Sequence, residues 1–179
     1  MKTQILSISF LSIVILTIAC SSPSKTAQQS RASAARLEPQ TLGSVKNLHV
    51  FNQQFYLASQ PSEDDLRQSK EKGIKTIVNL RPKSELTFDE EQFVRSLGMN
   101  YVHIPMTADS VKEKDIDKFI ETLATKANEP VLVHCASGNR VGFMWSMYRL
   151  RHDGLPINDA IQEGKTAGMK SESLVNRVR

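Results

Sequence analysis

The chain has 179 residues, enough for one domain with a buried core. Hydrophobic residues make up 40% and charged residues 23%, which is ordinary for a soluble globular protein. The net charge of +4 includes no dense block of lysine and arginine, so we expect a solvated surface and no nucleic-acid partner.

The N-terminus has the pattern of a targeting segment. Lys2 precedes an apolar run over residues 5–18, which is shorter than the roughly 20 residues that cross a bilayer but has the proportions of a secretory signal. Residues 17–20 read Thr-Ile-Ala-Cys and resemble a bacterial lipoprotein cleavage box. The resemblance implies a signal peptide at 1–19, a lipid on Cys20 that anchors the protein to a membrane, and a periplasmic location. Because Ser21 follows, it also implies outer-membrane sorting in a Gram-negative source. A plain secretory signal or an uncleaved anchor is the alternative.

Cysteine usage supports a reactive thiol further along the chain. There are two cysteines, and lipidation would use Cys20, which leaves Cys135 unpaired in an exported protein. Residues 20–43 are rich in Ser, Ala, Gln and Lys and lack apolar periodicity, so we expect a flexible tether there. The folded domain is expected over residues 44–179.

Within this domain, short strands alternate with helices. Strands are predicted at residues 48–51, 55–59, 74–80, 99–104 and 131–134. Helices are predicted at about 62–72, 88–97, 110–123, 140–153 and 156–168, with a further short helix from 169. This alternation predicts a three-layer α/β fold, a mostly parallel sheet flanked by helices on both faces. Ligands bind at the carboxyl ends of such strands.

Local signals locate the helix starts and the core. Capping boxes are predicted at Ser62 with Asp65 and at Ser110 with Glu113. The helix after Arg140 is apolar almost all round, so we expect it to be the central buried helix.

The candidate chemistry lies in residues 131–142. A β-branched run ends in His134 and Cys135, a small-residue loop with Gly138 follows, and Arg140 stands at the mouth of a helix. Loop N–H groups and a helix N-terminus can bind an anion, and arginine offers a planar fork that matches phosphate. The expected anion-binding residues are Ala136, Ser137, Gly138, Asn139 and Arg140. The same field favours a thiolate, which makes Cys135 a candidate nucleophile. The alternative is a small buried apolar residue after a core strand.

This stretch resembles the active-site loop of the cysteine-dependent phosphatases of the tyrosine and dual-specificity type. Their loop has five residues between the cysteine and the arginine, whereas this chain has four, and Val141 stands where they have a hydroxyl residue. The shorter spacing is also similar to the loop of rhodanese-type sulfurtransferases. The loop alone therefore leaves phosphate and sulfur chemistry open.

Four blocks in order extend the resemblance over about residues 45–170. They are residues 55–62, 73–82, 101–105 and 134–140. Together they are similar to the bacterial phosphatase-like family related to the phosphatase domain of beta-lactamase-hydrolase-like proteins. The resemblance implies a protein tyrosine phosphatase-like fold of the dual-specificity type, although relatives are linked to sulfur metabolism as well as to dephosphorylation.

A phosphatase of this type needs an acid to protonate the leaving oxygen. Asp109 lies on the expected loop, 26 residues before Cys135, although acids also occur there simply because a helix follows. Asp115 is a second candidate. The resemblance implies that His134 hydrogen-bonds backbone near the loop and supports the thiolate.

Three further expectations concern the surroundings of the loop. Arg81 ends a strand on the catalytic side and could help to bind an anion or form a surface salt bridge. Ser137 could donate to the thiolate in place of the hydroxyl missing at Val141. No metal site is expected, because His49, His103 and His152 lack ligand-like spacing, and no cofactor is expected either.

Three functional hypotheses follow. The first is a lipid-anchored periplasmic phosphatase that acts on a phosphorylated substrate through a phosphocysteine at Cys135. The second is a rhodanese-like sulfurtransferase that carries a persulfide on the same residue. The third is a non-catalytic lipoprotein that binds an anion or a protein.

Overall fold

The computed structural model describes residues 36–179, so the signal-peptide and lipidation predictions lie outside the described residues. A six-stranded sheet with the strand order β1-β2-β3-β6-β4-β5 forms the centre of the domain. Its strands are β1 (Leu37–Pro39), β2 (His49–Phe51), β3 (Phe55–Ala58), β4 (Thr76–Asn79), β5 (Asn100–His103) and β6 (Val131–His134). The pairs β3–β6, β6–β4 and β4–β5 are parallel, and the pairs β1–β2 and β2–β3 are antiparallel. The predicted mostly parallel sheet is therefore confirmed.

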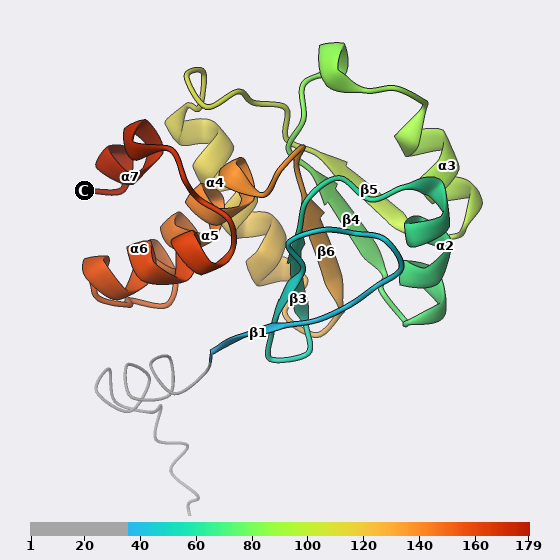
Figure 1. The fold of residues 1–179 in the computed structure, drawn as a ribbon, viewed down its shortest axis with the longest axis horizontal. Helices are drawn as coiled ribbons and strands as arrows, with labels where there is room; N and C mark the ends of the chain where they lie inside the picture. The colour runs from blue at the N-terminus through green and yellow to red at the C-terminus, as the bar shows by residue number, and fades with distance from the viewer. Residues whose placement is uncertain (1–35) are drawn as a thin grey trace, which may run out of the picture.

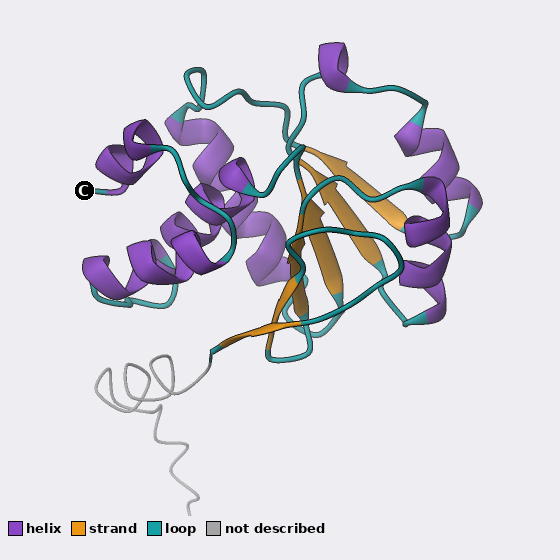
Figure 2. Ribbon diagram, viewed as in Figure 1, coloured by secondary structure: helices purple, strands orange, loops and turns teal. Residues whose placement is uncertain are grey.

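Helices cover both faces of this sheet (Figure 1). The helices are α2 (Glu63–Glu71), α3 (Glu90–Ser96), α4 (Glu113–Thr125), α5 (Asn139–Arg151), α6 (Ile157–Thr166) and α7 (Glu172–Val178), with a short 3-10 helix η1 (Lys83–Glu85). Figure 2 shows α2 and α3 on one side of the strands and the four later helices on the other. The three-layer prediction is confirmed. Within residues 36–179, no helix has the length and apolar character needed to span a bilayer.

Alternate side chains of the central strand point into two separate cores. Val131 and Val133 of β6 join the core under α4 to α7, whereas Leu132 joins the core under α2 and α3. All three side chains are fully buried. A strand covered on both faces must be apolar at every position, which is why this run lacks the alternation of an exposed strand.

The predicted central helix is α5, which is buried along most of its length. It packs against α6 at two helical glycines, where a Cβ atom added to Gly142 would lie 2.2 Å from the carbonyl oxygen of Gly164. The two helix backbones approach this closely only because neither glycine has a side chain. Cys135 therefore precedes a helix that is buried along most of its length, and Arg140 lies in its first turn.

Two local predictions are wrong. Helix α4 begins after Lys112 rather than after Ser110, because Asp115 accepts a hydrogen bond from the Lys112 N–H at 3.0 Å. Ser110 instead accepts from the Thr107 N–H at 2.9 Å and closes a separate turn. The capping box of Ser62 with Asp65 is confirmed.

The second error concerns the N-terminal boundary of the domain. Residues 37–39 form β1 within the predicted tether, and Leu42 is buried. The sheet thus begins before residue 44, because a three-residue edge strand pairs through its backbone and needs no apolar periodicity of its own.

Candidate active site

The candidate nucleophile lies at the carboxyl end of the central strand. Strands β3, β6, β4 and β5 run parallel, so the loops that follow them meet at one edge of the sheet. Cys135 directly follows β6, is fully buried and is a free thiol. The loop from Cys135 then turns into α5, as the sequence predicted.

A left-handed residue shapes the loop. Gly138 has a φ of 92°, and its N–H group donates to the sulfur of Cys135 at 3.1 Å. A Cβ atom at this position would lie 2.4 Å from Nδ2 of Asn47. Glycine is therefore required twice, by the backbone angle and by the close approach of Asn47. The loop backbone is also fixed from outside, because the N–H of Gln60 donates to the Ala136 carbonyl at 3.3 Å.

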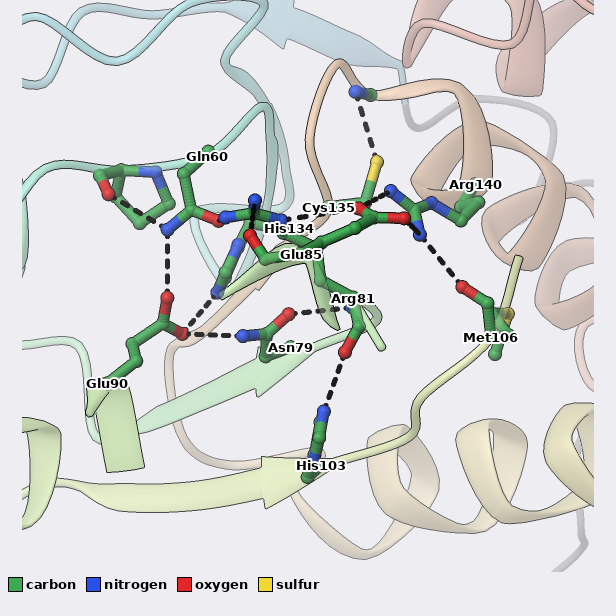
Figure 3. A network of polar contacts seen from close by, with 12 residues as sticks. Gln60, Asn79, Arg81, Glu85, Glu90, His103, Met106, His134, Cys135 and Arg140 are labelled. Carbon is green, nitrogen blue, oxygen red and sulfur yellow. Dashed lines mark hydrogen bonds and ion pairs between the residues drawn. The ribbon is translucent and has the colours of Figure 1, made fainter. Parts of the chain in front are cut away.

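Arg140 is fixed by two acceptors on neighbouring loops (Figure 3). Its Nη1 donates to Glu85 at 3.0 Å and to the Met106 carbonyl at 2.8 Å, and its Nη2 donates to Glu85 at 2.6 Å. Burial opposes the charge of Arg140, but Glu85 and the Cys135 sulfur outweigh this effect and raise the pKa of the guanidinium. An arginine carries five N–H donors, so these three bonds leave two donors for an oxyanion.

Glu85 lies between two arginines. Arg81 donates through Nε to the Glu85 carboxylate at 3.4 Å and through Nη2 to its carbonyl. The hydrogen bond from Arg140 is the largest cause that lowers the pKa of Glu85, and Arg81 adds to it. Arg81 thus forms an ion pair, as one alternative proposed, but its side chain is only 12% exposed and the pair belongs to the candidate site.

A buried carboxylate lies behind the nucleophile. Glu90 is 1% exposed and accepts from Asn79 at 2.9 Å and from Gln60 at 2.8 Å, and its Oε1 lies 2.7 Å from Nε2 of His134. The predicted backbone hydrogen bond of His134 is wrong, because its Nε2 faces this carboxylate and its Nδ1 has no partner among the described residues. Within residues 36–179, Glu90 is the ion-pair partner of the His134 Nε2 atom.

Gln60 connects this buried network to the arginine pair. Its Nε2 donates to Glu90, and its Oε1 accepts from Nη1 of Arg81. Figure 3 shows the resulting chain of side chains from His134 through Glu90, Gln60, Arg81 and Glu85 to Arg140. Both residues that flank the loop are therefore held by one set of polar contacts.

The remaining predicted site residues are exposed or bind other parts of the chain. Asp109 is exposed on the turn that follows β5, three residues after Met106, whose carbonyl accepts from Arg140. Ala136 and Ser137 are exposed on the loop, and the donor to the Cys135 sulfur is the Gly138 N–H rather than the Ser137 hydroxyl. The side chain of Asn139 accepts from the N–H groups of Lys170 and Ser171, so it fixes the segment between α6 and α7.

Comparison with known proteins decides the family. Residues 47–151 match the family described as the phosphatase-like domain of beta-lactamase hydrolase-like protein. The chain belongs to this family.

Curated members of the phosphatase-like family are longer than this chain. A beta-lactamase hydrolase-like protein of Xylella fastidiosa is 31% identical over 102 residues, which is 54% of this chain and 23% of that protein. Its counterpart in Agrobacterium fabrum is 29% identical over 123 residues, which is 66% of this chain and 28% of that protein. The chain thus spans about a quarter of the length of these relatives.

Solved structures show the same fold. Pseudomonas aeruginosa TpbA has a TM-score of 0.68 at 24% identity and covers 82% of this chain and 91% of its own. A DUF442 protein from Shewanella putrefaciens has a TM-score of 0.66 at 24% identity and covers 76% of this chain and 93% of its own. A cysteine-to-serine variant of TpbA, solved in complex with pTyr, has a TM-score of 0.65 at 22% identity and covers 82% and 87%. The predicted tyrosine phosphatase-like fold is confirmed.

Sequence reasoning missed three polar residues of this site, namely Gln60, Glu85 and Glu90. Gln60 and Glu85 had a usable signal, since each follows the end of a parallel strand, where functional side chains collect. Glu90 had none, because it opens a helix, and an acid in a first helical turn is ordinarily explained by the helix dipole.

Proposed function

We propose that this chain is a cysteine-dependent phosphatase that hydrolyses a phosphomonoester. The observation that carries the proposal is the placement of the Cys135 sulfur, the Gly138 N–H and the Arg140 guanidinium around one loop. Membership of a phosphatase-like family supports it, and so does the phosphotyrosine bound to a structural neighbour.

The reaction has two steps. The Cys135 thiolate attacks phosphorus, a sulfur–phosphorus bond forms, and the ester oxygen leaves with a proton from Asp109. Water then attacks the phosphocysteine, Asp109 takes up the proton from that water, and inorganic phosphate and the thiolate are released. The loop N–H groups and the two remaining donors of Arg140 stabilise the charge on the non-bridging oxygens in both steps.

Phosphate release from an aryl phosphate tests this function. We expect vanadate-sensitive turnover that Cys135→Ser abolishes and that Arg140→Lys lowers about 100- to 1000-fold in kcat, because lysine keeps the charge but loses the fork. Intact-protein mass spectrometry should trap a phosphate adduct on the wild-type chain. If the protein forms thiocyanate from thiosulfate and cyanide but releases no phosphate, it is a sulfurtransferase and the phosphatase proposal is wrong. Phosphate binding without turnover would favour a binding protein.

We also propose that the protein is a periplasmic lipoprotein anchored through Cys20. The lipoprotein-like box at residues 17–20 and the apolar run before it support this location. A lipid anchor would keep the phosphatase at a membrane surface, so its substrate would be a phosphorylated molecule that reaches the same compartment.

A further inference from the structure

The turn that carries Asp109 is closed at its base. The Ser110 N–H donates to the Thr107 carbonyl at 3.3 Å, and the Thr107 N–H donates to the Ser110 hydroxyl at 2.9 Å. Met106 and Val111, on either side of this turn, are 2% and 5% exposed, whereas Asp109 is exposed. The acid therefore projects from a short turn between two buried anchor residues.

Two arginines hold the backbone of this turn. Arg140 donates to the Met106 carbonyl at 2.8 Å, before the turn. Arg177 donates through Nη1 to the Ala108 carbonyl at 3.0 Å and through Nη2 to the Val111 carbonyl at 2.5 Å. The two carbonyls bound by Arg177 lie on either side of Asp109. One guanidinium fork thus bridges the two sides of the acid.

Arg177 is itself well supported. It lies on α7, whose residues Leu174, Val175 and Val178 are buried against the core. Its guanidinium lies 5.9 Å from the centre of the Phe143 ring on α5, the helix that follows the loop. Figure 1 shows α7 beside the segment that leads into α4. The arginine therefore connects the acid turn to the elements that carry Arg140.

We propose that Arg177 is a positioning residue for the general acid Asp109. This inference rests on the proposed function, because it assigns Asp109 a proton to transfer. An exposed turn would otherwise sample many positions, and a proton donor is effective only within hydrogen-bond distance of the leaving oxygen. The planar fork of Arg177 restrains Ala108 and Val111 together, and it restrains the carboxyl group between them without touching the substrate.

The dependence of the rate on the leaving group tests this role. Dinitrophenolate leaves phosphorus without a proton, whereas phenolate needs one. In Arg177→Met, which keeps an unbranched side chain but removes the guanidinium, we expect kcat/KM, which reports phosphocysteine formation alone, to fall at least about tenfold for phenyl phosphate. For 2,4-dinitrophenyl phosphate, kcat/KM should change less than about threefold. Asp109→Asn should show the same pattern more strongly. Adding Arg177→Met to Asp109→Asn should cause no further loss. Arg179→Met, which removes the same charge two residues away, should behave as wild type.

Equal losses on both substrates would mean that Arg177 only stabilises the fold, and unchanged rates on both would mean that the turn holds its position without it. Either result overturns the proposal. An Asp109→Asn variant without leaving-group dependence would also overturn the proposal. If Cys135→Ser still abolishes turnover in that case, the proposed phosphatase function stands and only the roles of Asp109 and Arg177 fail. A readout without turnover is amide hydrogen exchange over residues 106–112, which should be several-fold faster in Arg177→Met than in Arg179→Met. Identical exchange in the two variants would contradict the restraint itself.

Discussion

At the scale of single residues, the site depends on Glu90, a carboxylate that is only 1% exposed. Burial disfavours the charge of Glu90, yet the hydrogen bonds and charge of His134, with Gln60 and Asn79, outweigh it and lower the pKa of Glu90. Burial and the charge of Glu90 in turn raise the pKa of Tyr101, whose hydroxyl accepts from Asn79 at 2.9 Å. The contacts of this network therefore stabilise the ionised form of Glu90.

The lowered pKa of Glu90 predicts that the stability of the domain depends on pH. A carboxyl group with a lowered folded-state pKa contributes fully above its ordinary value of 4.5 and contributes less as the pH falls through the folded-state value. Glu90→Gln should therefore lower the free energy of unfolding by about 3–5 kcal/mol at pH 7. The difference from wild type should shrink below about pH 4.5, as urea unfolding at several pH values would show. The exposed neighbour Glu91, changed to Gln, should cost less than about 0.5 kcal/mol at every pH. A penalty in Glu90→Gln that stays constant down to pH 3.5 would contradict the role of the charge.

At the scale of elements, the contact between α5 and α6 supports the loop from behind. A Cβ atom at Gly164 would lie 1.9 Å from the Ser146 hydroxyl oxygen and 2.6 Å from the Gly142 carbonyl oxygen. The Ser146 hydroxyl itself donates to carbonyls of both helices, at 3.0 Å to Gly142 and at 2.9 Å to Ala160. Any side chain at Gly164 must therefore push the helices apart or break these hydrogen bonds.

Gly164→Ala should lower the free energy of unfolding by about 1–3 kcal/mol, the usual cost of overpacking. Its exposed neighbour Lys165, changed to Ala, should stay within about 0.5 kcal/mol of wild type, since it leaves the helix contact intact. Denaturant unfolding of both variants measures the difference. An equal denaturant midpoint for Gly164→Ala and Lys165→Ala would contradict the prediction, because it would mean that the two helices accommodate the added methyl group.

The elements also show how far the sequence could predict the fold. Runs such as residues 131–134, bounded by a proline and a loop, gave every central strand to within two residues because burial on both faces leaves a continuous apolar pattern. The edge strand β1 could not be predicted, because its pairing with β2 is a backbone property. The start of α4 was missed because the Ser110 hydroxyl accepts from the Thr107 N–H instead of capping the helix. The observed cap residue is Lys112, a residue type that carries no capping signal in the sequence.

The sequence could predict the residues of one continuous motif, but it could not predict which distant residues contact them. Cys135, Gly138 and Arg140 belong to one motif, and both the Gly138 N–H and the Arg140 guanidinium interact with the Cys135 sulfur. Glu85 lies 55 residues before Arg140, and no spacing rule connects the two. Arg177 lies 66 residues beyond Val111, where the short last helix returns to the site.

At the scale of the whole molecule, we predict that Cys20 carries only the lipid anchor and Cys135 only the catalytic thiol. Cys20→Ala should release the protein from the membrane fraction and leave its kcat unchanged, since the residues that hold Cys135 all lie in the described domain. Cys135→Ser should remain lipidated but inactive. Fractionation, intact mass and phosphate release measure the three properties in the same samples. A Cys20→Ala chain that stays membrane-bound after correct cleavage would contradict the anchor.

The strand order affects when the sheet can assemble during synthesis on the ribosome. Strand β6 lies between β3 and β4, which do not pair with each other. Until residue 134 has emerged, β3 and β4 each lack the strand that pairs with them in the folded sheet, so each keeps an unpaired edge. Such edges invite association with other chains, and joining them is a late, long-range step. The strand that precedes Cys135 is the last of the six described strands in chain order, so a chain that stops before residue 131 has neither a joined sheet nor the candidate nucleophile.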